Sequence, residues 1–448
     1  MLPCTLEHLA SMIDATVTVT ATVNPIIQGF SIDSRKTIEG DLFIALKGAR
    51  DGHDFLQDAA NRGAKAALVS RSTTILPSVC VVDTQSALTQ LATRLRDDYR
   101  GVVFALTGSQ GKTSTRGFLR AILNQMADPS KVLATQGNLN NHLGVPLTMS
   151  CLRQKHQFAL FELGASALGE IGQLTSIIRP KISGLLNARE AHLEGFGSIE
   201  GVIEGKGEII EKTDPNGTVV LNRDDMAFDT WRQRTGSRQI ISFGQKQGDV
   251  IWTPISEQEV RLDFGDRQID VHLATLGKHF MANAAAAAAM AFSYDASDRA
   301  IRLGLEEAYI EDGRMTPIRI GTQLVIDDTY NASPHSVRAA IDWLSLKKGG
   351  RVVIMGGLTE LGSVAKSEMA ALGIYAREKG IERLIATGSG LPIAEGFGPS
   401  AIYIEALNNL ISKLSSLTTD ANIILVKGSR SERMDRVVEA FKQMEGER

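Results

Sequence analysis

Short apolar runs alternate with longer amphipathic stretches along most of the 448-residue chain. In the middle of the chain, four of these runs predict buried strands, at residues 102–106, 158–161, 182–186 and 219–222. Each strand is followed by a polar segment long enough for a turn and a helix. Strands that alternate with helices form parallel sheets, so we expect an α/β domain here.

The pattern changes twice toward the end of the chain. Residues 260–264 and 268–273 alternate with period two around Gly265, Asp266 and Arg267, which predicts an antiparallel hairpin. An alanine-rich helix is expected from about Asn283. After Met315, apolar strands at 324–327, 351–355, 383–386 and 423–426 alternate with helical segments at 334–346, 365–379, 405–416 and 430–443. This rhythm predicts a doubly wound, Rossmann-like domain, but no G-x-G-x-x-G follows its first strand, so a dinucleotide is not indicated.

The first 83 residues form a third unit. Strands are expected at 26–32, 42–46, 66–69 and 80–82, with a helix at 55–62, and an amphipathic helix at 84–101 leads into the middle of the chain. The fold class is therefore α/β with three domains. They are a small α/β domain at 1–83, a central domain with a parallel sheet and added antiparallel strands at 84–312, and a Rossmann-like domain at 313–448.

Composition narrows the class of protein. Apolar residues make up 43% of the chain and charged residues 22%, as in ordinary globular proteins. A net charge of −3 argues against a nucleic-acid partner, which would select a basic surface. The three cysteines are too few and too scattered for a disulfide framework. No signal peptide is recognisable and no apolar run approaches the roughly 18 residues of a membrane span, so we expect a cytoplasmic protein.

The clearest chemical signal is the phosphate loop, residues 107–115, which stands between the strand at 102–106 and a helical pattern. Glycines let the backbone approach a polyphosphate, and the free N–H groups at a helix start point toward its oxygens. Lys112 can reach the β- and γ-phosphates, and the Thr113 hydroxyl can bind Mg²⁺. The strict motif requires glycine where Leu106 stands, and an ordinary glycine turn is the alternative. The loop nevertheless predicts ATP binding through these residues: Gly108, Ser109, Gln110, Gly111, Lys112, Thr113 and Ser114.

Four other groups are ambiguous when each is taken alone. Glu162 ends a predicted strand, where it could ligate Mg²⁺ or cap a helix. His192 could be structural, and Lys206 could be an ordinary surface lysine. Residues 138–146, rich in amides and ending at Pro146, could be a plain turn.

Together these segments resemble the Mur ligases, the ATP-dependent amide-forming enzymes of peptidoglycan precursor synthesis. The resembling stretches follow in order across all three predicted domains, at 33–36, 40–48, 107–113, 137–141, 144–146, 162–164, 191–198, 206–209, 327–332, 360–362 and 427–430. Within the family, the likeness is greatest to the member that joins D-alanyl-D-alanine to UDP-N-acetylmuramoyl-tripeptide. Leu106, where the strict phosphate-loop motif requires glycine, is a feature of the loop in the family that the chain resembles.

The resemblance implies catalytic roles for Lys112, Glu162, His192 and Lys206. Thr113 and Glu162 would bind one Mg²⁺, and Glu162 with His192 a second. Lys206 would carry a carbamate formed with CO₂, which turns a cation near Mg²⁺ into a carboxylate-like ligand. A lysine can react in this way only if its neutral form is accessible, as burial near other cations provides.

The resemblance also implies binding residues on the other domains. His279 and Asn283 would contact the adenine, and Arg314 and Asp328 would hold the nucleotide from the third domain. The substrate-binding candidates are Ser34, Arg35, Lys47, Asn138, Asn141 and Asn331. The clusters at 33–36 and 47–55, which alone would be solvated turns, would bind the uridine diphosphate end of the sugar substrate. Ser333 departs from the family pattern, in which an asparagine is usual.

The implied partners are UDP-N-acetylmuramoyl-tripeptide and D-alanyl-D-alanine, with ATP and Mg²⁺ as cofactors. We expect neither nucleic-acid binding nor a membrane span, and a monomer. Because two domains must reach the substrates, residues 314–448 are expected to close on the centre. The alternatives are a related ligase that adds a single amino acid, such as the third-residue-adding enzyme or a folylpolyglutamate synthetase, or a nucleotide-driven switch. A GTPase would need an Asn-Lys-x-Asp motif, which the sequence lacks.

Overall fold

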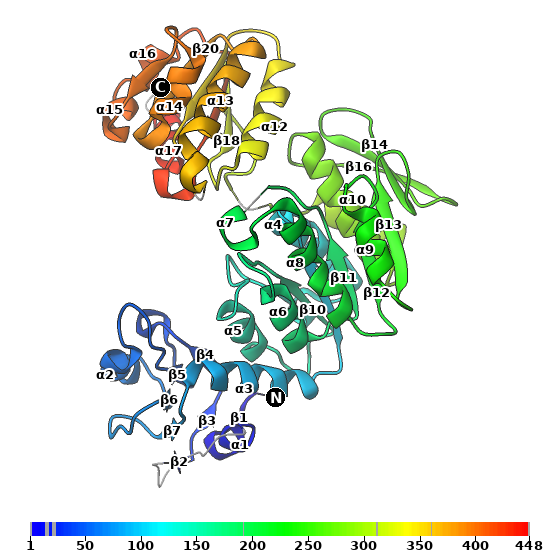
Figure 1. Ribbon diagram of the computed structural model, residues 1–448, viewed down its shortest axis with the longest axis vertical. Coiled ribbons are helices and arrows are strands. Elements are labelled where there is room, and N and C mark those ends of the chain that lie inside the picture. Colours follow the sequence, from blue (N-terminus) through cyan, green and yellow to red (C-terminus); the bar gives the residue numbers. More distant parts are fainter. Residues whose placement is uncertain are drawn as a thin grey trace.

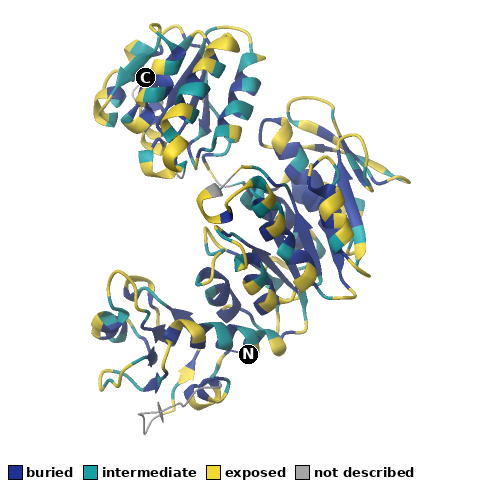
Figure 2. Ribbon diagram, viewed as in Figure 1, coloured by how far each residue is buried: buried dark blue, intermediate teal, exposed yellow. Residues whose placement is uncertain are grey.

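The computed structural model describes residues 2–13, 18–19, 24–190, 192–310, 312–359 and 361–446. Ala191 and Glu360, which belong to two of the resembling stretches, lie outside the described residues. Three bodies follow one another along the chain, with the N-terminal and C-terminal ones on either side of the central one (Figure 1). The dark interior of each body in Figure 2 shows that each buries a sheet of its own. The three-domain α/β class is confirmed.

The central body is built on a nine-stranded sheet with the order β16-β15-β14-β13-β12-β11-β8-β10-β9. Strands β8 to β14 run parallel, and β15 and β16 are added antiparallel at one edge. The strands are β8 (Val102–Thr107), β9 (Val132–Ala134), β10 (Phe158–Glu162), β11 (Ile182–Leu185), β12 (Thr218–Asn222), β13 (Gln239–Gly244), β14 (Val250–Pro254), β15 (Glu259–Asp263) and β16 (Gln268–His272). Since β8 lies between β10 and β11, the residues that follow these three strands meet at one edge.

Helices cover both faces of this sheet. One face packs against α4 (Lys112–Met126), α10 (Lys278–Phe292) and α11 (Asp298–Glu306), through a buried cluster that includes Phe118, Ile122 and Ala284. The other face packs against α5 (Gly144–Ser150), α6 (Glu170–Ile178), α8 (Ile199–Lys212) and α9 (Phe228–Arg234). The alanines of α10 let it approach α4 closely, because their side chains end at Cβ.

The N-terminal body has a five-stranded sheet with the order β2-β7-β6-β5-β4. Its elements are β1 (Cys4–Thr5), α1 (Leu6–Ser11), β2 (Thr18–Val19), β3 (Ile26–Ile27), β4 (Gly29–Ser31), β5 (Asp41–Ile44), α2 (Leu56–Asn61), β6 (Ala66–Val69) and β7 (Ser78–Cys80). Helix α3 (Thr84–Asp97) begins with Asp83 as its N-cap and buries Leu88, Leu91 and Leu95. It carries the chain from this body to β8.

The C-terminal body has a six-stranded sheet with the order β17-β18-β22-β19-β20-β21, parallel except at β17. The strands are β17 (Thr316–Ile320), β18 (Gln323–Asp328), β19 (Arg351–Met355), β20 (Arg383–Thr387), β21 (Ile402–Ile404) and β22 (Ile423–Lys427). The helices are α12 (Pro334–Ser345), α13 (Ala365–Glu378), α14 (Leu391–Phe397), α15 (Leu407–Ile411), α16 (Leu414–Leu417) and α17 (Asp435–Gly446). The alternating strands and helices form the Rossmann-like domain that the sequence predicts.

Several element boundaries differ from those that the sequence predicts. The strand expected at 26–32 is divided into β3 and β4, and the helix expected at 405–416 is divided into α15 and α16. Helix α10 begins at Lys278, ahead of the predicted start at Asn283, and its first turn already buries Phe280 and Met281. Seven strands are not among the predicted ones, namely β1, β2, β9, β13, β14, β17 and β21. Among the described residues, no helix is long and apolar enough to cross a membrane.

Candidate functional site

The phosphate loop connects β8 to α4 in a conformation that depends on glycine. Gly111 has φ 79° and occupies the N-cap position of α4 without a side-chain cap, so the first N–H groups of the helix are available to a ligand. A Cβ on Gly111 would lie 2.3 Å from Oδ1 of Asn283. Asn283, predicted to contact the adenine, therefore packs directly against the loop.

Asn187, just after β11, holds the other side of the phosphate loop. Its Oδ1 accepts the backbone N–H of Gln110 at 2.9 Å, and its Nδ2 donates to the Gln110 carbonyl at 3.1 Å. Its own carbonyl accepts the N–H of Ser109 at 3.0 Å. The sequence did not assign Asn187 a role, although an amide at a strand end is visible in it.

Lys112 lies over the loop, with its Nζ donating to the Gly108 carbonyl at 2.7 Å. Burial lowers the pKa of Lys112, Glu162 opposes this shift, and the positive charge of Arg314 adds to it. Arg314 belongs to the segment that leads into the C-terminal body, and its guanidinium stacks over the Tyr330 ring at 3.8 Å. The structure thus brings the predicted nucleotide contact Arg314 into the electrostatic range of Lys112.

Glu162 ends β10 directly beside β8, where it pairs with Leu106, and is only 2% exposed. Its Oε1 accepts the Thr113 hydroxyl at 3.3 Å and the Asn140 side-chain amide at 2.9 Å. The two residues expected to share a Mg²⁺ ion, Thr113 and Glu162, are therefore adjacent. Their oxygen ligands suit Mg²⁺, which prefers carboxylate and hydroxyl groups completed by phosphate oxygens and water.

Lys206 is not the surface lysine that its sequence context would suggest. It is 1% exposed on α8, donates to the Ala165 carbonyl at 3.2 Å, and lies 5.1 Å from the centre of the Phe196 ring. Burial, followed by the charge of Lys112, lowers the pKa of Lys206 to about 7. The neutral amine required for reaction with CO₂ is therefore accessible near neutral pH.

His192 stands at the entrance to the short helix α7 (Leu193–Phe196). Its φ of 54° is left-handed, and its carbonyl accepts the N–H groups of Gly195 and Phe196. Within the described part of the chain, no three His, Cys, Asp or Glu side chains gather into a metal-sized cluster. Any divalent cation here would depend on mixed ligands such as Thr113, Glu162 and bound phosphates.

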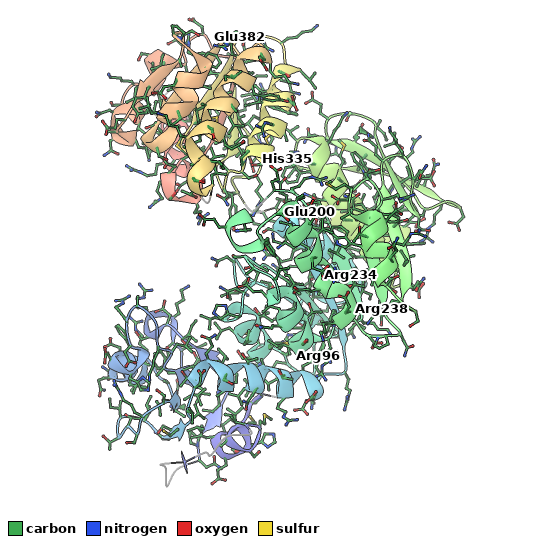
Figure 3. All side chains as sticks on the ribbon, viewed as in Figure 1. Arg96, Glu200, Arg234, Arg238, His335 and Glu382 are labelled. Carbon is green, nitrogen blue, oxygen red and sulfur yellow. The ribbon has the colours of Figure 1, made fainter. Side chains whose placement is uncertain are left out.

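Other residues predicted to contact the nucleotide belong to the central and the C-terminal bodies. His279 lies in the first turn of α10 beside Phe280. Asp328, at the end of β18, forms a 2.6 Å ion pair with buried Lys427 and accepts the N–H of Met315. Figure 3 shows His335, at the start of α12, on the side of the C-terminal body that faces the central one.

The predicted substrate residues are dispersed. Ser34 is buried, whereas Arg35 is exposed and paired with Asp33, and Lys47 is exposed. All three belong to the N-terminal body, which is separate from the central body that carries the phosphate loop (Figure 1).

The other three predicted substrate residues belong to the central and C-terminal bodies. Asn138 is exposed on the amide loop, defined as residues 137–141. Asn141 uses its Oδ1 to accept the N–H groups of Leu143 and Gly144, which gives it a structural role at the start of α5. Asn331 is exposed, and its carbonyl accepts a hydrogen bond from Lys427.

Two further residues at Glu162 are not predicted from the sequence. Asn140 belongs to the amide loop, but nothing in the motif distinguishes it from Asn138 or Asn141. Arg116 lies one helical turn after Lys112, where no sequence pattern marks it. Its Nη1 is 3.1 Å from Oε2 of Glu162.

Comparison with known proteins gives the same picture for the whole chain. Sequence models of the Mur ligase family match three stretches, namely its catalytic domain at residues 26–94, its middle domain at 106–291 and its glutamate ligase domain at 313–430. The UDP-N-acetylmuramoyl-tripeptide–D-alanyl-D-alanine ligase of Escherichia coli K12 is 38% identical over 431 residues, which cover 93% of this chain and 94% of that protein.

Solved structures agree. A crystal structure of MurF from Acinetobacter baumannii superposes with a TM-score of 0.90 at 33% identity, covering 98% of this chain and 99% of that one. MurF from Thermotoga maritima, solved in complex with ADP, gives a TM-score of 0.82 at 28% identity and covers 94% of this chain and 98% of that one. By its sequence over nearly its full length, this chain belongs to the Mur ligase family.

Proposed function

We propose that the protein is an ATP-dependent ligase that joins D-alanyl-D-alanine to UDP-N-acetylmuramoyl-tripeptide. The observation that carries the proposal is the convergence of Lys112, Thr113 and Glu162 at one phosphate loop, with buried Lys206 near enough for the charge of Lys112 to lower its pKa. The full-length likeness to ligases named for this reaction supports the choice of substrates. The products are UDP-muramoyl-pentapeptide, ADP and phosphate.

The reaction proceeds in two steps. The terminal carboxylate of the tripeptide attacks the γ-phosphorus of ATP, the bond to the bridging oxygen breaks, and ADP leaves behind an acyl phosphate. The free amine of D-alanyl-D-alanine then attacks the acyl carbon, and the tetrahedral intermediate expels phosphate. Activation is needed because a carboxylate is a poor electrophile with a poor leaving group.

The chain's own residues would position and neutralise these groups. The N–H groups at the start of α4 and the ammonium of Lys112 hold the phosphates as negative charge gathers on the transferred group. Thr113, Glu162, His192 and carbamylated Lys206 would hold Mg²⁺, which supplies charge neutralisation at the phosphoryl group when bound. His279, Asn283, Arg314 and Asp328 hold the rest of the nucleotide.

The substrates would bridge the domains. Ser34, Arg35 and Lys47 bind the uridine diphosphate end, Asn138 and Asn141 the muramoyl part, and Asn331 the dipeptide side. This division assigns domain 1–83 to the UDP-sugar, 84–312 to ATP, and 313–448 to the dipeptide and to closure over ATP. We place the reaction in the cytoplasm and expect the enzyme to act as a monomer.

The release of phosphate from ATP tests the proposed function directly. The protein is incubated with ATP, Mg²⁺ and UDP-muramoyl-tripeptide, and D-alanyl-D-alanine or single amino acids are added in turn. We expect release that depends on both the tripeptide and the dipeptide. Release with a single amino acid would indicate another ligase of the superfamily, and release that needs neither acceptor would indicate a nucleotide-driven switch.

A further inference from the structure

Arg116 connects three segments of the site from within the protein. It lies on α4, and its side chain is 6% exposed, against 3% for that of Glu162, to which it is ion-paired. The same Nη1 donates to the Gly137 carbonyl of the amide loop at 2.8 Å. One guanidinium thus joins the helix that begins at the phosphate loop, the end of β10 and the amide loop.

The contacts of Glu162 divide its two oxygens between different partners. Oε2 lies 3.1 Å from Nη1 of Arg116, whereas Oε1 accepts hydrogen bonds from the Thr113 hydroxyl, next to the phosphate-loop lysine, and from the side-chain amide of Asn140 in the amide loop. The guanidinium attracts Oε2 by its charge, while two hydrogen bonds hold Oε1, so the carboxylate is drawn into one orientation from both sides. Arg116 therefore orients Glu162 toward the phosphate loop.

The amide loop is attached to the same carboxylate at two points. Gly137 is held through its carbonyl by Arg116, and Asn140 donates to Oε1 while its own carbonyl accepts the N–H of Gly164 at 2.8 Å. A Cβ at Gly164 would lie 2.9 Å from Oδ1 of Asn140, so this end of the loop packs tightly. A change in the conformation of the amide loop can therefore move Glu162 through Arg116 and through Asn140.

We propose that Arg116 is a positioning residue that sets the orientation of Glu162 and the conformation of the amide loop together. Because Asn138 and Asn141 of this loop are proposed to touch the muramoyl substrate, Arg116 couples substrate binding to cation binding. The coupling to substrate rests on the proposed function, whereas the orientation of Glu162 does not.

The test uses the full chain with R116M and R116K, and with R120M as a control at an exposed arginine on the same helix. Binding of Mn²⁺ in the presence of ADP is followed by the electron paramagnetic resonance signal of free Mn²⁺. We expect R116M to weaken Mn²⁺ binding about 10–100-fold, the usual effect of losing a residue that supports a metal ligand. ADP binding in EDTA should stay within about twofold, because Lys112 and the loop amides remain.

Steady-state kinetics provides the second readout. R116M should raise the KM for UDP-muramoyl-tripeptide about tenfold or more. R116K keeps a charge beside Oε2, but its shorter side chain is not expected to reach the Gly137 carbonyl as well, so it should recover Mn²⁺ binding and leave the KM for the tripeptide high. R120M should change neither quantity.

The outcomes separate this inference from the proposed function. Wild-type Mn²⁺ affinity and wild-type KM in R116M would overturn the inference. If R116M does not fold, R116K decides, since a wild-type KM for the tripeptide in R116K would also overturn it. If the wild-type protein does not turn over the tripeptide, the proposed function fails, while the Mn²⁺ titration still tests whether Arg116 orients Glu162.

Discussion

The side-chain amide of Gln110 donates a 3.1 Å hydrogen bond to the hydroxyl of Ser333, which joins the phosphate loop to the start of α12. Ser333 is also the N-cap of α12 and forms a capping box with Ser336. A second approach between the same two bodies occurs at Gly362, where a Cβ would lie 2.7 Å from Oε1 of Glu194. The C-terminal body therefore touches the loop that is expected to hold the nucleotide phosphates.

This contact leads to a prediction about domain position. Q110A should weaken the contact between the central and C-terminal bodies by about 1 kcal/mol. The equilibrium between the contacting and the separated arrangement of these bodies should then shift roughly fivefold toward the separated one. The measurement is energy transfer between dyes on the central and C-terminal bodies, with and without an ATP analogue and tripeptide substrate. Small-angle scattering should show a more compact particle when both ligands are bound.

Ser333 has two roles, so its variant needs a matched control. S333A should lose both the contact with Gln110 and about 1 kcal/mol of helix capping. S297A removes a comparable N-cap, that of α11, whose side chain accepts a hydrogen bond from the N–H of Ala300 in the same body. Identical energy-transfer distributions for the wild type and Q110A, or scattering unchanged by ligands, would contradict the coupling.

Gly111 is predicted to be indispensable for nucleotide binding. G111A introduces a left-handed alanine, at a cost of about 1–2 kcal/mol, and also a clash with Asn283. G169A is the matched control, because Gly169 has φ 86° at the N-cap of α6, but a Cβ added there would meet no atom within 4 Å. Both variants should lose stability in urea, and only G111A should lose ATP binding by calorimetry. Normal ATP binding by G111A would refute the proposed role of the loop.

Replacement of Lys206 should abolish turnover. K206A removes the side chain that the proposal assigns to a carbamate, so phosphate release should fall to background and recover partly when a short carboxylate such as acetate is added. Lys212 at the end of the same helix provides the control, and K212A should retain wild-type turnover. Undiminished activity in K206A would exclude the carbamate role.

The lowered pKa of Lys206 predicts how stability changes with pH. In the folded protein the amine loses its proton at about pH 7, whereas in the unfolded chain it keeps its proton up to about pH 10. Between these values the unfolded state binds more protons, so the folded state gains stability as pH rises. In CO₂-free buffer, the wild type should gain about 2 kcal/mol relative to K206M between pH 7 and pH 9. A difference that does not change with pH would show that Lys206 titrates normally.

The ion pair between Lys427 and Asp328 should matter more than an exposed one. Their side chains are 3% and 13% exposed, so K427M leaves a mostly buried carboxylate unpaired, at a cost of about 3–5 kcal/mol. Hydrogen exchange in β18 and β22 should report this loss. K442A, which breaks an exposed pair with Glu439, should cost less than about 1 kcal/mol. Equal effects of the two variants would contradict the assignment.

The sequence by itself determined the fold class and the chemistry of the phosphate loop. Short apolar runs at β8, β10, β11 and β12, each followed by a helical pattern, indicate parallel strands, because such strands are buried on both faces. Gly111, Lys112 and Thr113 are adjacent in the chain, so their joint role is readable without a structure. The resemblance then linked distant segments in their correct order.

Only the tertiary structure decided which distant residues touch. Nothing local marks Arg116 or Asn140 as partners of Glu162, because their contacts depend on the order of β8 and β10 in the sheet and on the path of the amide loop. The burial of Lys206, and hence its pKa, depends on how α8 packs beside Phe196 and Ala165. Periodicity along one segment reports which face is apolar, whereas the polar partners of a buried charge come from other segments that the fold brings together.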